Sequence, residues 1–190
     1  MKKSRFFALA TLALAPLFLA SCGSGSTDTA SLTTFKGEGF SIDVPKSWIA
    51  KESKEVPTPK NGSVALAMTS SDISSGFANN LLVLKDTLTV DEKGEKMTSK
   101  KYSVVNQALT TGKYEEYTKL DEKEITFADS DVSNLYVFEA KYNRDTPKKR
   151  FVQAAKVCDD KVYLITVGVE LNSGSTAKYE SLAKSFQCVK

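Results

Sequence analysis

From residue 32 onward the chain is a succession of short apolar runs separated by turn signals, with helical periodicity in only two places. Apolar and polar residues alternate along Phe40–Val44, which is the pattern of a strand with one buried face. The glycines at 37 and 39 favour a hairpin between that strand and residues 33–36. Further strands are expected at 64–68, 81–84, 125–127, 135–142, 151–157 and 162–169. Because the connections between neighbouring runs are short, antiparallel pairing is favoured.

The first helix is expected over residues 98–111. Its apolar residues share one face, and they are Met97, Val104, Val105 and Ala108. Thr98 or Ser99 can cap the N-terminus of this helix, and Gly112 suits its C-terminus.

The second helix is expected over residues 175–187. Its apolar stripe consists of Tyr179, Leu182, Ala183 and Phe186. Many strands with two separated helices indicate an α+β fold, in which an antiparallel β-sheet is covered by helices. The charged stretch 113–124 is expected to be a solvated loop or the edge of a strand.

The first 21 residues have the three parts of an export signal: a positive start, an apolar middle and small residues at the end. The apolar stretch 6–20 is too short to span about 30 Å of hydrocarbon as a stable helix. The ending Leu19–Cys22 resembles the bacterial lipobox, whose cysteine is thioether-linked to diacylglycerol and becomes the new N-terminus. We therefore predict a lipoprotein signal peptide over 1–21 and lipid attachment at Cys22.

Residues 22–31 are rich in Gly, Ser and Thr and have no apolar periodicity, which predicts a flexible tether. The remaining residues, 32–190, have the length of one α+β domain. Together these features predict localisation in the bacterial cell envelope, with the protein held to a membrane by two or three acyl chains. In a cell with two membranes, Gly23 in place of Asp after the cysteine resembles the pattern that is sorted to the outer membrane.

The charge and the absence of histidine exclude several functional classes. Three of the 26 basic residues lie in the signal segment, so the rest of the chain has as many basic as acidic residues, 23 of each. A neutral chain is not typical of a nucleic-acid-binding protein. No histidine is present, which excludes Ser–His and Cys–His catalysis and every histidine-ligated metal site. We predict that the protein is not an enzyme and binds no cofactor, no metal and no nucleic acid.

Two motifs resemble functional ones without their full context. Ser181–Lys184 and Ser175–Lys178 match the S-x-x-K nucleophile motif, but Ser181 would lie about 150° from the apolar stripe, facing solvent. An exposed lysine keeps its proton and cannot activate a serine. Residues 129–134 match half of a calcium loop, but glycine is missing at its sixth position and glutamate at its twelfth. A polar turn between two strands explains that segment better.

Trp48, the only tryptophan, has two interpretations. A tryptophan can anchor a ligand or a protein partner. Because Trp48 follows Pro45 in a turn that shapes the fold, packing in or at the rim of the core is favoured over such a contact.

The two remaining cysteines are expected to form a disulfide, because exported chains reach compartments where disulfides persist. Cys158 ends one strand, and the following strand leads away from the same turn for about 25 Å. The helix over 175–187 then returns about 20 Å, which brings Cys188 near Cys158. The alternative is two unpaired, buried thiols.

The order of several short motifs resembles the PsbP-like family. Gly39–Trp48, a strand followed by Pro and then Trp, resembles the opening signature of that family. Matching motifs follow in order at 78–81, 136–138, Gln153, 163–166 and 185–186. The resemblance covers about residues 35–187 and implies an α-β-α sandwich around an antiparallel sheet. Relatives include the extrinsic photosystem II subunit and many bacterial lipoproteins without an assigned role, and the metal sites of the photosynthetic branch use histidine and do not transfer.

These observations leave three hypotheses of function. The first is a lipid-tethered, non-catalytic module that binds another envelope protein or supports assembly of an envelope complex. The second is binding of a small ligand or lipid in a cleft between the sheet and the 98–111 helix, which an apolar pocket with a few polar groups would favour. The third is an enzyme that uses carboxylates or Ser and Lys without histidine.

Overall fold

The structure is a computed structural model that describes residues 31–56, 59, 61–74, 77–88 and 94–189. The predicted signal peptide (1–21), Cys22 and the tether up to residue 30 lie outside the described residues. Within the described part, no helix is both long and apolar enough to cross a membrane.

The described strands form two antiparallel sheets. The large sheet has the strand order β3-β4-β5-β9-β8-β7-β6, and the small sheet has the order β1-β2-β10. The large sheet consists of β3 (Trp48–Ala50), β4 (Ser63–Ser74), β5 (Phe77–Thr87), β6 (Glu115–Thr126), β7 (Val132–Lys141), β8 (Lys149–Cys158) and β9 (Lys161–Val169). The small sheet consists of β1 (Leu32–Gly37), β2 (Phe40–Pro45) and β10 (Gln187–Cys188). The short segment η1 (Ser53–Glu55) is a 3-10 turn between β3 and β4.

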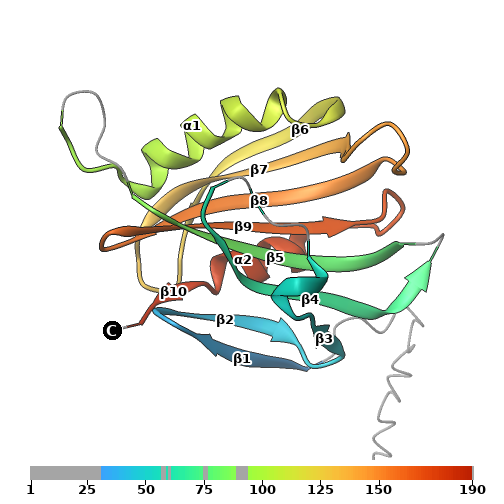
Figure 1. Cartoon of the computed structure of the whole chain (residues 1–190), viewed down its shortest axis with the longest axis horizontal. Helices are drawn as coiled ribbons and strands as arrows, with labels where there is room; N and C mark the ends of the chain where they lie inside the picture. Colours follow the sequence, from blue (N-terminus) through green and yellow to red (C-terminus); the bar gives the residue numbers. More distant parts are fainter. Residues whose placement is uncertain (1–30, 57–58, 60, 75–76, 89–93, 190) are drawn as a thin grey trace, which may run out of the picture.

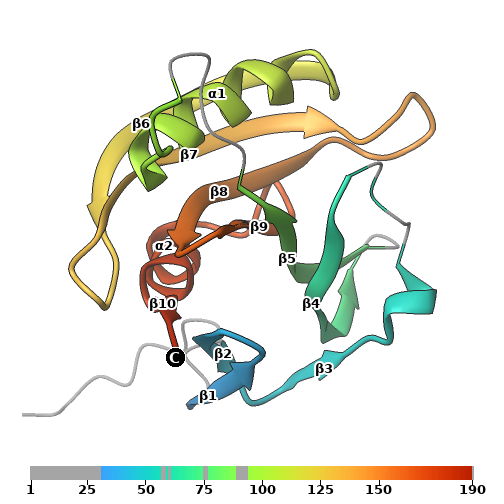
Figure 2. The same ribbon diagram turned by 60° about the vertical axis from the view of Figure 1, so that its left-hand side comes forward.

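Helix α1 (Ser99–Thr111) lies on one side of the large sheet, and the small sheet with helix α2 (Ala177–Lys184) lies on the other (Figures 1 and 2). The main core fills the space between the large sheet, the small sheet and α2. Its centre is aromatic: the rings of Phe40 and Phe186 stack with centroids 5.1 Å apart, and the Tyr163 ring packs against both. The α+β fold with an antiparallel sheet between helical layers, predicted from the sequence, is confirmed.

The second helix is shorter than predicted. It ends at Lys184, and Phe186 reaches the core from the segment that follows it. Beyond Phe186 the backbone becomes extended and pairs with the small sheet, Gln187 opposite Ser41 and Cys188 opposite Phe40. Pairing with an existing strand satisfies the last backbone groups, which is why the helical pattern does not continue to residue 187.

The charged stretch before the predicted 125–127 strand is itself strand. β6 extends over Glu115–Thr126, pairs with β7 and forms one edge of the large sheet. Most of its side chains are exposed, so it lacks the apolar alternation by which the shorter strand was predicted.

Cys158 and Cys188 form a disulfide with their Cα atoms 5.7 Å apart. The bond joins the end of β8 to β10, as the predicted course of the chain between the two cysteines requires. The residues predicted to form one helix, 175–187, consist in the structure of α2 and the extended segment that follows it.

Replacing both cysteines, Cys158→Ser with Cys188→Ser, should destabilise the fold. Closing a loop over a sequence separation of 30 residues contributes about 3–4 kcal/mol in the chain-entropy model. We expect a melting temperature roughly 10 °C lower, measured by circular dichroism. Reductant should lower the melting temperature of the wild type and leave the double variant unchanged. A wild type indifferent to reductant would contradict the stabilising role.

Candidate functional site

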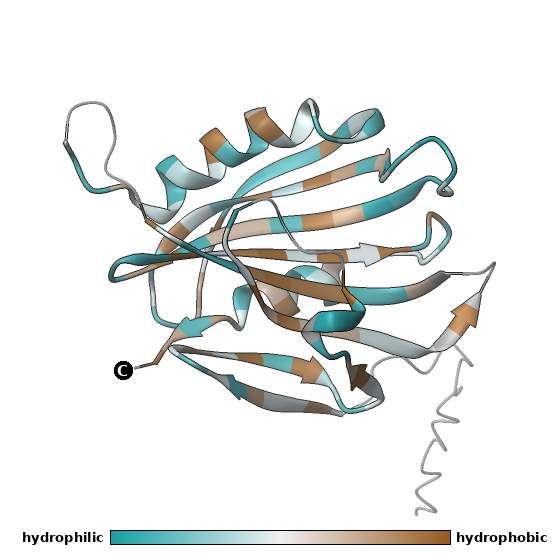
Figure 3. Cartoon of the chain, viewed as in Figure 1, coloured by the Kyte–Doolittle hydropathy of each residue, from teal (hydrophilic) through white to brown (hydrophobic). Residues whose placement is uncertain are grey.

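Helix α1 turns its polar side to the sheet and its apolar side to solvent. Its buried residues are all polar: Ser99, Ser103, Asn106, Gln107 and Thr110. The exposed side carries Val104, Val105 and Leu109, of which 50%, 45% and 57% of the surface is accessible. Hydrophobic segments are visible along α1 in Figure 3. A helix on a sheet normally buries its apolar stripe, so the face that the sequence marks as apolar is here left uncovered.

Hydrogen bonds to the strands beneath hold α1 in this orientation. The Asn106 amide donates to Gln153 Oε1 on β8 (3.0 Å), and the Gln153 amide donates to Thr166 Oγ1 on β9 (3.0 Å). Near the start of the helix, Ser103 Oγ accepts from the backbone N–H of Asn134 on β7 (3.3 Å). Rotating the helix to bury its valines would leave these buried polar groups without partners, which is costly. The outward position of the apolar face is therefore specified by the sequence.

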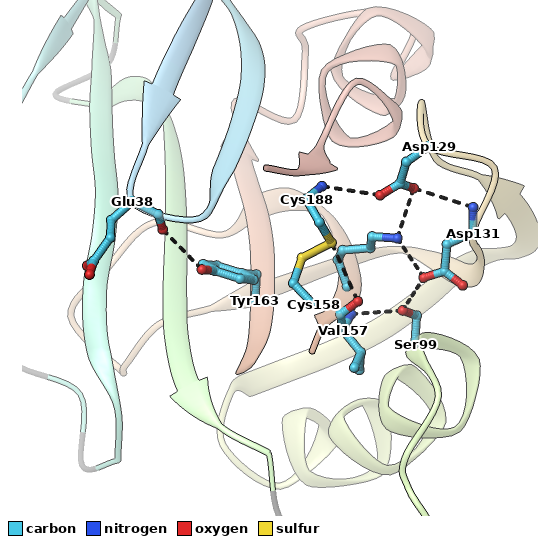
Figure 4. The surroundings of a disulfide bond; sticks show 9 residues. Glu38, Ser99, Asp129, Asp131, Val157, Cys158, Tyr163 and Cys188 are labelled. Atoms are coloured by element: carbon cyan, nitrogen blue, oxygen red, sulfur yellow. Dashed lines mark hydrogen bonds and ion pairs between the residues drawn. A yellow bond between two sulfur atoms is a disulfide. The ribbon is translucent and has the colours of Figure 1, made fainter. Parts of the chain in front are cut away.

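The N-terminus of α1 is attached to a buried ion cluster (Figure 4). Lys156 on β8 is 2% exposed, and its Nζ lies 2.9 Å from Asp129 Oδ1 and 2.8 Å from Asp131 Oδ2. Ser99 Oγ donates a hydrogen bond to Asp131 and accepts one from the backbone N–H of Val157 (2.8 Å). The cluster thus connects β8, the β6–β7 turn and α1.

The same cluster explains the partial calcium motif at 129–134. The two aspartates that match the motif bind the ammonium of Lys156, so a lysine supplies the positive charge that a cation would supply. The Asp129 carboxylate also accepts a hydrogen bond from the backbone N–H of Cys188 (3.2 Å), next to the disulfide. Among the described residues, no group of three or more Cys, Asp or Glu side chains has the arrangement of a metal site.

The cluster shifts the pKa of Asp129. Burial acts to raise this pKa, but the hydrogen bonds from Lys156 and from the Cys188 backbone, with the charge of Lys156, outweigh it. The pKa of Asp129 is therefore held below its usual value. The ionised carboxylate is the form that the folded state favours.

Asp129→Asn should lower stability and weaken its dependence on pH. Because the folded pKa is depressed, the stabilisation is present above the unfolded pKa of about 3.9 and is lost as the pH falls through the folded value. We expect the free energy of unfolding of the variant to be about 1–3 kcal/mol lower at pH 7 and to fall less steeply below about pH 4. Denaturant unfolding over a pH series measures both, with exposed Asp145→Asn as the control. Identical pH slopes in variant and wild type would contradict the assignment.

A groove runs beside α1, over the part of the large sheet that the helix does not cover. Its volume is about 730 Å³. Leu84 on β5 and Val162 and Leu164 on β9 line it on the sheet, and Tyr102 and Leu109 line it on α1. The remaining lining residues are Pro59, Asn61, Asp86, Asn106, Gly112, Lys113, Tyr114 and Tyr142. The groove lies where a cleft between sheet and helix was considered from the sequence.

Two tyrosines of the groove, Tyr102 and Tyr114, stay protonated over the physiological pH range. Burial, with the nearby Asp86 carboxylate, raises the pKa of Tyr102, and burial raises the pKa of Tyr114 to about 12. They therefore present rings and neutral hydroxyl groups. With its aliphatic lining, the groove has the chemistry of a binding surface.

The other residues considered from the sequence lie away from α1. Trp48 is 7% exposed and belongs to the main core. This is the packing position that the sequence favoured over a contact with a ligand or a partner. Ser181 is exposed on α2 and its hydroxyl donates to the backbone oxygen of Ala177 (3.0 Å). The predicted lipid attachment residue, Cys22, lies outside the described residues.

Sequence reasoning missed the groove residues of α1 and the segments around it. Leu109 lies four residues after Val105 on the same helix face, so helical spacing could have identified it. Tyr114 and Tyr142 come from the ends of separate elements, and their rings meet with centroids 6.2 Å apart. No periodic signal marks that approach.

No family model matches the chain, and no curated protein matches its sequence. Among solved structures, it is similar to the cyanobacterial PsbP of Synechocystis, with a TM-score of 0.57 and 15% identity over 90% of this chain and 99% of that chain. It is also similar to a point mutant of the protein Mog1, with a TM-score of 0.52 and 13% identity over 84% of this chain and 97% of that chain. The Ran-binding protein Mog1p of Saccharomyces cerevisiae has the same identity and coverage with a TM-score of 0.49. At such identities the likeness concerns the fold alone, and the PsbP-like fold implied by the sequence motifs is confirmed.

Proposed function

We propose that the protein is a lipid-tethered, non-catalytic binding module of the bacterial cell envelope that contacts a protein partner through the exposed face of α1. The observation that carries the proposal is the orientation of this helix, which buries five polar residues and leaves Val104, Val105 and Leu109 exposed. Clustered aliphatic side chains on a surface mark interaction sites, because covering them releases water from apolar surface.

The groove extends this contact surface. Leu109 belongs to both the exposed face and the groove, so the two are continuous. A partner with an apolar projection can lie on α1 and enter the groove against Leu84 and Leu164. Buried apolar anchors of this kind contribute most of the affinity of a protein interface.

The position of the predicted tether supports a partner on this side. The described chain begins at β1, which lies on the opposite side of the large sheet from α1 (Figures 1 and 2). A flexible segment of the length of residues 22–31 has a root-mean-square end-to-end distance of about 18 Å. This distance is smaller than the diameter of a domain of this size, so the domain could not rotate freely relative to the membrane. A lipid at Cys22 would thus direct α1 away from the membrane and towards soluble partners.

A double substitution on α1, Val105→Lys with Leu109→Lys, should abolish partner binding without unfolding the protein. We would place a photo-crosslinking amino acid at Ala108 in cells and compare adducts with and without the substitutions. The expected result is at least a tenfold loss of a discrete adduct, about 1.4 kcal/mol, with the free energy of unfolding unchanged within about 0.5 kcal/mol. The matched control is Leu120→Lys, an equally exposed position on β6. Adducts that survive the double substitution would contradict the proposal.

Lipid attachment at Cys22 has its own test. Cys22→Ala should release the protein from the membrane fraction or leave its precursor unprocessed, because the acyl chains are the proposed anchor. Fractionation of the envelope with acyl labelling of the wild type measures this. A variant that remains membrane-bound and is processed normally would rule out the lipoprotein assignment.

Binding of a small ligand or lipid is the second candidate function, and the groove is the observation that favours it. Its volume of about 730 Å³ falls within the range of small-molecule sites, and it combines aliphatic lining with tyrosine hydroxyls, Asp86 and Lys113. The two functions are distinguished by what is recovered with the protein when it is purified from its native envelope: a bound small molecule or a crosslinked protein.

A further inference from the structure

The end of the domain at which the tether begins carries three exposed aliphatic side chains. Leu32 is 51% exposed at the start of β1, Ile49 is 55% exposed on β3, and Ile73 is 72% exposed near the end of β4. We refer to Leu32, Ile49 and Ile73 as the basal residues. They lie away from α1 and the groove and take no part in the contact proposed above.

Strand register brings the basal residues to the same end of the molecule. The backbone N–H of Lys46 donates to the oxygen of Ser31 (3.1 Å), which fixes the first described residue beside the β2–β3 turn. Leu32 pairs with Pro45 just before that turn. Trp48, just after it, pairs with Ser70, so β4 continues past the turn towards Ile73. In Figure 1, β3, the start of β1 and the end of β2 lie below the large sheet, and the end of β4 lies higher, at the right of the molecule.

We propose that the basal residues insert into the interfacial layer of the membrane to which the protein is tethered, so that the domain lies on the lipid surface in one orientation. This inference rests on the proposed lipid attachment at Cys22. It adds a second, direct contact between protein and lipid.

The length of the predicted tether identifies the occupant as lipid. Residues 22–31 span at most about 35 Å when fully extended and about 18 Å on average. Because Ser31 is held at the β2–β3 turn, this end of the domain, with Leu32 and Ile49 next to the turn, stays close to the acyl chains. Such a tether gives a local concentration in the millimolar range, so a second contact that is weak by itself adds to the attachment.

The surroundings of the basal residues fit a headgroup region. The charges of η1 form pairs close to β3, with Lys51 3.9 Å from Glu55 and Lys54 2.6 Å from Glu52. Lys46 is exposed in the β2–β3 turn and makes no ion pair with any described residue, so its ammonium is available to lipid phosphates. Exposed aliphatic tips beside a lysine are typical of segments that lie in the membrane interface.

Fluorescence quenching tests this contact on the full-length lipoprotein. The protein would be reconstituted in vesicles of phosphatidylethanolamine and phosphatidylglycerol, some containing a lipid with a nitroxide on its upper acyl chain. A fluorophore would be attached to Ile73→Cys or, as matched control on α1, to Thr111→Cys; the native disulfide does not react without reductant. We expect quenching of at least about twofold at position 73 and none at position 111.

A second labelling position tests whether the fluorophore itself causes the membrane contact. With the fluorophore on Ser47→Cys, in the exposed β2–β3 turn, the double substitution Ile49→Ser with Ile73→Ser should reduce quenching to the level at position 111. Equal quenching at positions 73 and 111, or quenching at 47 that survives the double substitution, would overturn the inference. Flotation of the protein with the vesicles separates this result from failure of the tether: a protein that does not float overturns the lipid attachment, and with it the contact proposed here.

Discussion

A buried ammonium group fixes the start of α1 to the rest of the fold. Lys156 points into a region closed by the Asp129 and Asp131 carboxylates and by the ring of Phe127, whose centroid lies 5.2 Å from Nζ. A charge in such a place is tolerated only when it is paired and hydrogen-bonded. The two carboxylates meet this requirement, and their remaining contacts reach Ser99 at the start of α1 and the backbone of Cys188 in β10. One lysine thereby joins elements from both sides of the large sheet.

The orientation of α1 follows from this attachment. Once Ser99 is fixed at the cluster and Asn106 at Gln153, the face of the helix towards the sheet is set by hydrogen bonds. Val104, Val105 and Leu109 therefore lie on the face of the helix that points to solvent. Stability and exposure of an apolar surface are thus linked in this molecule, because the polar contacts that hold the helix are the ones that keep its apolar residues in solvent.

The elements that the sequence predicts well are those whose signal is local. The alternation along Phe40–Val44 anticipates β2, and Thr98 and Gly112 bound α1 as expected, with the Thr98 hydroxyl accepting from the Lys101 backbone. The cysteine pairing was predicted from the lengths of the elements between the two cysteines together with the expected export, although the helix is shorter than predicted. The direction in which α1 faces could not be inferred, because it depends on Gln153 and Asn134, far away in the sequence, whose contacts leave no periodic signal. A cleft beside this helix was considered from the sequence, but the residues that line the groove escaped prediction, since Tyr114 and Tyr142 meet only in the folded chain.

If the protein is anchored to a membrane as proposed above, the charged edge strand β6 has a consequence for how its copies meet. Anchored copies share a two-dimensional space, where they meet side by side far more often than in solution. An open sheet edge invites a neighbouring copy to add its own strand, which is the first step of aggregation. Along β6, charged side chains, most of them glutamates, occupy the majority of the exposed positions. Two irregularities in its register with β7 interrupt the strand, one of them at the positive φ of Glu116. The edge is therefore a poor template for pairing, and a domain anchored as proposed would reach high surface density while its copies remain separate.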